Sequence, residues 1–140
     1  MESLPSPTVF VVDDDPSVCK ALSRLLRTAG WNVRSFQSAE QFLAYEREGG
    51  IGCLVLDIRM PDMDGLALQR RLLEEAPGLP IVFITGQEED ETIMPELAHG
   101  TIAVIPKPLD EKTLLAAIVK SFARQSGPGR EEPAPQGRKP

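Results

Sequence analysis

Five side chains with charged or hydroxyl groups stand where short apolar runs of the sequence stop. They are Asp13 and Asp14 after the run 9–12, Asp57 after 53–56, Thr85 after 81–84, and Lys107 shortly after 102–105. An aspartate carboxylate can serve as a nucleophile in covalent catalysis. An ammonium group and a hydroxyl group can stabilise charge on the oxygens of a transferring phosphoryl group. The set therefore predicts transfer of a phosphoryl group to an aspartate, with Asp57 as the acceptor.

The three aspartates also predict a divalent cation. Three carboxylates that lie close together cannot all stay ionised without a cation beside them. An open site that is rich in oxygen atoms and keeps several waters suits Mg²⁺. The ion and Lys107 would offset the carboxylate charge, so that a dianionic phosphoryl donor can approach Asp57. We therefore expect Mg²⁺ here, with Mn²⁺ as an alternative ion.

These side chains converge only if the apolar runs are parallel strands of one sheet. The expected strands are 9–12, 32–36, 53–56, 81–84 and 102–105, and helical patterns follow Asp15, Ser38, Asp64 and Asp110. Alternation of strands and helices implies a parallel sheet covered on both faces, and near-continuous apolar runs are typical of such strands. The predicted fold is α/β, a doubly wound five-stranded sheet of order 2-1-3-4-5, whose ligand crevice lies at the carboxyl ends of the strands.

Composition limits the function classes. The 140 residues suit one domain, and a formal net charge of −6 argues against direct contact with nucleic acid. Neither a signal peptide nor an apolar run of about 20 residues is evident, so we expect no membrane contact. Cys19 and Cys53 lack metal-binding spacing and are predicted to be buried free thiols, which fits a cytoplasmic protein. We expect a frayed segment at 1–7, one domain at 8–124, and a disordered tail or linker at 125–140.

Four motifs resemble the receiver domain of two-component response regulators. They are VVDD at 11–14, LDIRMPDMDG at 56–65, ITG at 84–86 and KP at 107–108. The resemblance covers about residues 8–123 and implies a flavodoxin-like receiver. The Arg-Met-Pro-Asp-Met and Thr-Gly segments are similar to the FixJ-type subfamily.

The resemblance implies a role for each matched position. Asp57 is the phosphoacceptor, and it ligates Mg²⁺ together with Asp14 and the backbone carbonyl of Arg59. By the same resemblance, Asp13 would hold the water shell of the metal, and Thr85 and Lys107 would contact the phosphoryl group. Arg59 and Gln87 would control the lifetime of the phosphoryl group. The peptide bond before Pro108 would be cis.

The resemblance also implies the partners. The phosphoryl donor would be a phosphohistidine on a sensor histidine kinase or a phosphotransfer protein. The output would pass through a further domain or an effector protein, with transcription as one outcome if a DNA-binding domain is attached. The chain would be a signalling phosphoacceptor that catalyses only its own phosphorylation and dephosphorylation. It would act as a monomer or as a phosphorylation-dependent homodimer.

Two residues depart from the family pattern in the switch region. Many receivers carry an aromatic residue three positions before the lysine, where this chain has Val104. Pro95 falls inside the expected fourth helix, and an interior proline costs a helix about 3 kcal/mol. We therefore expect that helix to start near Pro95 and to span one or two turns, after an irregular loop at 87–94.

Two other functions fit parts of the pattern. One is a pseudo-receiver that binds partners without phosphorylation, although the complete set of acidic residues argues against it. The other is a phosphatase of the haloacid-dehalogenase type, which uses an aspartate like Asp13 as its nucleophile with Mg²⁺. Pro16 and the short chain disfavour the phosphatase. The aspartate that carries the phosphoryl group distinguishes this alternative from a receiver.

Overall fold

The computed structural model describes residues 7–45, 52–76, 78–86 and 101–126, with side chains up to 123. The fourth helix expected near Pro95, its preceding loop and Gln87 lie outside the described residues. So do most of the two expected terminal tails. Within the described part of the chain, no helix is long and apolar enough to cross a membrane.

Five parallel strands form one sheet in the order β2-β1-β3-β4-β5. The strands are β1 (Thr8–Val12), β2 (Asn32–Phe36), β3 (Gly52–Asp57), β4 (Ile81–Thr85) and β5 (Thr101–Pro106). This confirms the predicted doubly wound α/β sheet. The edge position of β5 also accommodates Pro106, because a proline lacks the N–H that a central strand must donate.

The described helices begin at the polar residues that the sequence marks as caps. They are α1 (Pro16–Thr28), α2 (Ala39–Ala44), α3 (Gly65–Glu75) and α4 (Glu111–Ser126). The carboxylates of Asp15, Asp64 and Asp110 each accept a hydrogen bond from a backbone N–H in the first turn, which satisfies donors that a helix start leaves unpaired. The label α4 belongs to the last helix of the chain, which extends two residues past the expected boundary at 124.

Two local features define the end of α1 and the start of α2. Gly30 follows α1 with a φ of 101°, the left-handed conformation that favours glycine after a helix. Ser38 and Gln41 form only part of a capping box at the start of α2. The Ser38 hydroxyl accepts from the Gln41 N–H at 3.0 Å, but the Gln41 side chain accepts from the N–H of Gln37 rather than from that of Ser38.

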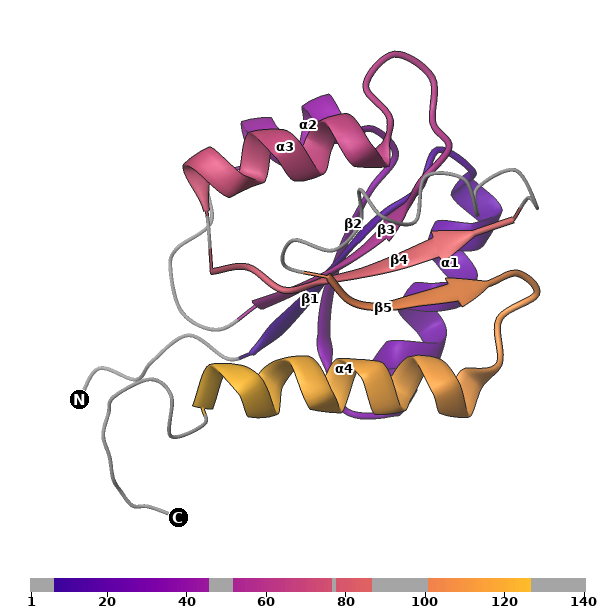
Figure 1. Cartoon of the computed structure of the whole chain (residues 1–140). Helices are drawn as coiled ribbons and strands as arrows, with labels where there is room; N and C mark the ends of the chain where they lie inside the picture. The colour runs from indigo at the N-terminus through magenta and orange to yellow at the C-terminus, as the bar shows by residue number, and fades with distance from the viewer. Residues whose placement is uncertain (1–6, 46–51, 77, 87–100, 127–140) are drawn as a thin grey trace.

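Helices α2 and α3 cover one face of the sheet, and α1 and α4 cover the other (Figure 1). Alternate strand residues point to opposite faces, so each strand contributes to two apolar layers. In β1, Val9 and Val11 pack in the layer under α1 and α4, whereas Phe10 and Val12 pack in the layer under α2 and α3. The sheet is therefore buried on both faces, as its continuous apolar runs predict.

The register brings the carboxyl ends of the strands to one edge of the sheet. Val12 at the end of β1 is level with Leu56, one residue before Asp57. Asp57 is level with Ile84, one residue before Thr85, and Thr85 pairs with Pro106. Residues that are far apart in the sequence, from 13 to 107, therefore meet at this edge.

Candidate metal and phosphoryl site

Three carboxylates meet at the carboxyl edge of the sheet. Asp13, Asp14 and Asp57 each offer one oxygen atom, and these oxygens all lie within 4.8 Å of one another. Asp13 and Asp57 are buried, with 1% and 6% of their surface exposed, whereas Asp14 is exposed. The cluster thus has a buried base and an open side, which is the geometry that a substrate or an ion from solvent can reach.

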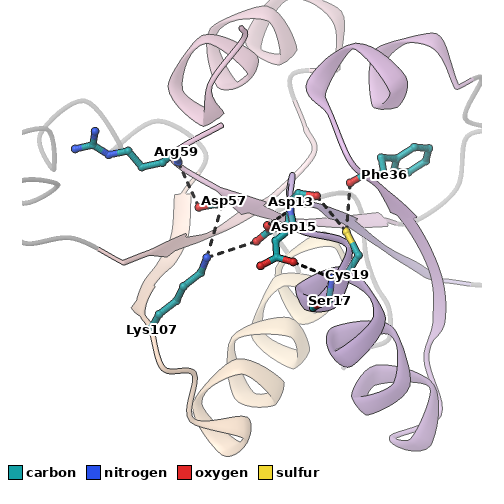
Figure 2. Close-up of polar contacts among 8 residues, drawn as sticks. All are labelled: Asp13, Asp15, Ser17, Cys19, Phe36, Asp57, Arg59 and Lys107. Atoms are coloured by element: carbon teal, nitrogen blue, oxygen red, sulfur yellow. Dashed lines mark hydrogen bonds and ion pairs between the residues drawn. The ribbon is translucent and has the colours of Figure 1, made fainter. Parts of the chain in front are cut away.

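Lys107 places an ammonium group beside this cluster. Its Nζ lies 3.7 Å from Asp13 Oδ2 and 3.8 Å from Asp57 Oδ2 (Figure 2). Its backbone N–H donates to the carbonyl of Thr85 at 2.7 Å, which ties the residue to the end of β4. The peptide bond between Lys107 and Pro108 is cis. The side chain is 34% exposed, so its charge is partly screened by solvent and only partly compensates the two buried carboxylates.

The backbone and the carboxylate of Asp13 are both fixed. Its N–H donates to the Phe36 carbonyl at the end of β2, at 3.1 Å, and its Oδ1 accepts from the N–H of Asp15 at 2.9 Å. Its other oxygen, Oδ2, is buried and accepts no hydrogen bond; the contact with Lys107 at 3.7 Å is a long ion pair. A buried carboxylate oxygen that lacks a donor is costly, so this atom marks a position that a water or a cation would stabilise.

The loop after β3 holds the carboxylate of Asp57. The N–H of Arg59 donates to Asp57 Oδ1 at 3.3 Å, so the backbone at Arg59 lies beside the acidic cluster. The Arg59 side chain is exposed and extends away from the carboxylates of Asp57 and Asp13 (Figure 2). The N–H of Ile58 donates to the Ile84 carbonyl at 3.1 Å, which continues the sheet one residue beyond the strand.

Burial makes both inner carboxylates weaker acids than usual. The pKa of Asp57 rises to about 6, chiefly because the group is removed from water and secondly because Asp13 is close. Lys107 and the Arg59 N–H act in the opposite direction. Burial likewise raises the pKa of Asp13. Without further positive charge, the carboxylates therefore repel one another and retain protons more readily than exposed aspartates do.

The residues fit a hard divalent cation. Three carboxylates supply oxygen ligands, which Mg²⁺ prefers over nitrogen or sulfur, and the open side at Asp14 leaves room for waters. The buried Oδ2 of Asp13 has no hydrogen-bond donor, which a water bound to such an ion could provide. A cation here would also lower the raised pKa values of Asp13 and Asp57.

The predicted site residues separate into three groups. The first group lies together at the edge of the sheet and consists of Asp13, Asp14, Asp57 and Lys107. Thr85 is half-buried at the end of β4 and is joined to Lys107 through the backbone. Val104 is half-buried in the layer under α2 and α3, and Gln87 and Pro95 lie outside the described residues.

Two supporting residues were not predicted to act on the site. A Cβ atom at Gly65 would lie 2.6 Å from the Asp57 carbonyl oxygen, so only glycine allows α3 to start this close to the acceptor strand. The Asp-Gly pair that ends the loop was the available signal. The second residue is Cys19, whose thiol donates to the Asp13 carbonyl. Burial raises its pKa, so it stays a neutral donor, and no sequence pattern pointed to this role.

Comparison with known proteins shows the same family over most of the chain. Residues 9–119 match the response regulator receiver domain. The chain is 41% identical to the response regulator protein TmoT of Ectopseudomonas mendocina over 128 residues, or 91% of this chain and 57% of TmoT. It is 36% identical to the transcriptional regulatory protein FixJ of Rhizobium meliloti, over 81% of this chain and 56% of FixJ.

A solved structure supports the same conclusion. The response regulator StyR superposes with a TM-score of 0.82 at 44% sequence identity, over 87% of this chain and 62% of StyR. The chain spans about half the length of the curated relatives it matches. The motifs at the strand ends, the strand order and these similarities agree, and the chain belongs to the response regulator receiver domain family.

Proposed function

We propose that this domain accepts a phosphoryl group on Asp57 in a Mg²⁺-dependent reaction of two-component signalling. One observation carries the proposal. The carboxylate of Asp57 is almost fully buried, belongs to a cluster of three carboxylates within 4.8 Å, and lies 3.8 Å from the ammonium group of Lys107. A nucleophilic carboxylate, oxygen ligands for a cation and a fixed positive charge are the components that phosphoryl transfer requires.

The proposed step moves one phosphoryl group between two proteins. An oxygen of Asp57 attacks phosphorus, the P–N bond of a partner phosphohistidine breaks as the P–O bond forms, and the imidazole leaves with the electron pair and takes a proton. Lys107 Nζ and the Thr85 hydroxyl contact the phosphoryl oxygens and stabilise their charge. A bound Mg²⁺ would neutralise further charge on those oxygens. It would be held by Asp14, Asp57 and the Arg59 carbonyl, and by Asp13 through a water.

The partners follow from this chemistry and from the relatives. We propose that the donor is a sensor histidine kinase or a phosphotransfer protein, and that the output is a further domain or an effector, including transcriptional regulation as in FixJ. The domain itself would contact neither DNA nor a membrane, and it would not turn over a substrate as an enzyme does. Two buried free thiols fit a cytoplasmic location.

The lifetime and readout of the acyl phosphate would depend on residues around the acceptor. Arg59 is exposed and follows Asp57 by two positions, and Gln87 follows Thr85 by two positions; we propose that both tune the hydrolysis of the acyl phosphate. Val104 is too small to act as an aromatic switch, so we propose that readout does not depend on a coupled rotation of Thr85 with an aromatic side chain.

An acceptor variant tests the proposal. Wild-type protein, incubated with Mg²⁺ and acetyl phosphate, should gain the mass of one phosphoryl group by intact mass spectrometry, and EDTA should prevent the gain. Asp57→Asn should show no gain. Asp62→Asn, which changes an exposed aspartate of the same loop, is the matched control and should behave as the wild type. Undiminished uptake by Asp57→Asn would refute the assignment.

The same assay separates the alternative functions. If the wild type takes up no phosphoryl group and does not respond to Mg²⁺ with beryllofluoride, the chain is a binding module that works without phosphorylation. If the mass gain persists in Asp57→Asn and disappears in Asp13→Asn, the chemistry is that of the phosphatase type. The two outcomes are mutually exclusive.

A further inference from the structure

We propose that Cys19 is a positioning residue for the cation site: its buried thiol fixes the backbone of Asp13, so that the free carboxylate oxygen of Asp13 faces the position of the ion. This inference rests on the proposed function, because the ion matters only for phosphoryl transfer to Asp57. It assigns a role to a residue on α1, outside the set of strand-end residues.

The thiol joins two strand ends. Cys19 Sγ lies 3.2 Å from the carbonyl oxygen of Asp13 after β1 and 3.5 Å from the carbonyl oxygen of Phe36 at the end of β2. Figure 2 shows the sulfur beside the carboxylates of Asp13 and Asp15, with a contact drawn to each of the two carbonyl oxygens. The Phe36 carbonyl also accepts the N–H of Asp13 at 3.1 Å. The residue is 4% exposed, so no solvent molecule replaces the thiol as a donor.

The helix that carries Cys19 is tied to the same loop. The N–H of Cys19 donates to the Asp15 carbonyl at 3.1 Å, and the N–H of Asp15 donates to Asp13 Oδ1 at 2.9 Å. Asp13 is therefore held at three atoms: its N–H by Phe36, its carbonyl by Cys19, and one carboxylate oxygen by Asp15. These restraints leave the side chain little freedom to rotate.

The remaining atom of Asp13 is the independent sign of a ligand. Oδ2 belongs to a residue that is 1% exposed and lacks any hydrogen-bond partner, and it is the oxygen that faces Lys107. A carboxylate that is free to rotate would turn such an oxygen toward a donor. The restraint through Cys19 keeps it available to a water of the cation, in the way that outer contacts orient metal-binding groups.

Cys53 provides a matched control. It is also a buried free thiol, but it lies in the middle of the sheet and shares a hydrogen bond with Ser121 rather than with the acidic loop. Removing either sulfur deletes the same atoms from the core. Only the removal of the Cys19 sulfur takes a donor from Asp13.

The experiment compares Mg²⁺ binding across four proteins. Isothermal titration of metal-free protein with MgCl₂ gives the affinity, and acetyl phosphate uptake at increasing Mg²⁺ gives the half-saturating concentration and the plateau rate. Cys19→Ala should weaken Mg²⁺ binding by about three- to tenfold, the effect of one net hydrogen bond, and should raise the half-saturating Mg²⁺ concentration more than it lowers the plateau rate. Cys19→Ser, which keeps a donor, should restore most of the affinity. Cys53→Ala should bind Mg²⁺ as the wild type does.

Each outcome decides the question. Equal Mg²⁺ affinity in Cys19→Ala and wild type, equal weakening in Cys53→Ala, or no rescue by Cys19→Ser would overturn the proposal. If Cys19→Ala does not fold, Cys19→Val, which refills the space without a donor, takes its place with the same expectation. Failure here with uptake still lost in Asp57→Asn would leave the proposed function intact. Uptake by Asp57→Asn would contradict the proposed function instead.

Discussion

The two faces of the sheet bury apolar side chains, whereas its carboxyl edge buries charged ones. On the faces, the largest fully buried side chains are all apolar, and they pack in two layers under the helices. At the edge, Asp13 and Asp57 are buried with raised pKa values, and one oxygen lacks a donor. Apolar packing on the faces stabilises the fold. The buried carboxylates at the edge destabilise it, but they lie where a cation and a phosphoryl group can bind. Such local conflicts are characteristic of functional sites.

The largest expected effect on stability comes from a substitution in the apolar layer on one face of the sheet. Phe83 on β4 is fully buried under α2 and α3, and Phe83→Ala should lower the unfolding free energy by about 3–5 kcal/mol, because it leaves a cavity. Urea unfolding measures the loss. The folded fraction should still take up a phosphoryl group, since Phe83 belongs to no part of the edge. Leu73→Ala, at a side chain that is 42% exposed, is the control and should change stability by less than about 0.5 kcal/mol.

The next effect comes from the charge at the edge. The folded pKa of Asp57, about 6, exceeds the ordinary value of 3.8, so between these values the folded state binds more protons than the unfolded state. The unfolding free energy should therefore fall as pH rises from about 4 to 6, and a difference of this size corresponds to about 3 kcal/mol. Protein unfolded by urea in EDTA at several pH values shows the trend.

Asp57→Asn isolates this contribution. The variant should lose the part of the fall that Asp57 causes, keeping only the contribution of Asp13, whose pKa is also raised, and should be more stable than the wild type at pH 7. Saturating Mg²⁺ should remove much of the difference, because it compensates the carboxylates. A wild type that gains stability relative to Asp57→Asn as pH rises would show that the edge is already compensated, and the contrast with the faces would disappear.

Gly65 connects the two regions. A methyl group at this position would meet the backbone of Asp57 at 2.6 Å and that of Ile58 at 2.9 Å, so Gly65→Ala should cost about 1–3 kcal/mol and also reduce phosphoryl uptake. Gly78→Ala is the control, because nothing lies within 4 Å of its Cβ position. Equal stability and equal uptake in the two variants would mean that α3 can retreat from the acceptor strand without consequence.

The smallest effect concerns the loop at the edge. Asp62 has a φ of 66°, a left-handed conformation that is strained for residues other than glycine. Asp62→Gly should raise the unfolding free energy by less than about 1 kcal/mol, because the added freedom of the unfolded chain offsets part of the relief. Phosphoryl uptake should stay unchanged. A clear loss of stability would show that the Asp62 side chain makes a contact worth more than the strain.

Much of this could be predicted from the sequence, because it depends on local rules. Apolar runs and capping residues set the strands and helices, and alternation of the two implies a parallel sheet whose strand ends meet. That reasoning brings Asp13, Asp57 and Lys107 together before any coordinates are known. The confirmed strand order shows that these local patterns all favour the same fold.

The remaining features depend on packing between elements. Residue type and position do not distinguish the adjacent Asp13 and Asp14. In the structure Asp13 is buried and Asp14 is exposed, because alternate positions along the chain point to opposite sides. The thiol of Cys19 reaches two carbonyls only because the start of α1 lies beside the ends of β1 and β2. The half-formed capping box at α2 likewise reflects the path of the chain between β2 and the helix.

The identity of the phosphorylated residue tests the central claim most directly. Protein treated with acetyl phosphate and Mg²⁺ can be reduced with borohydride, which converts an aspartyl phosphate to homoserine, and the modified position can then be read by peptide sequencing in a mass spectrometer. We predict homoserine at position 57 alone. Homoserine at position 13 or 14, or none in protein that has gained the phosphoryl mass, would contradict Asp57 as the acceptor.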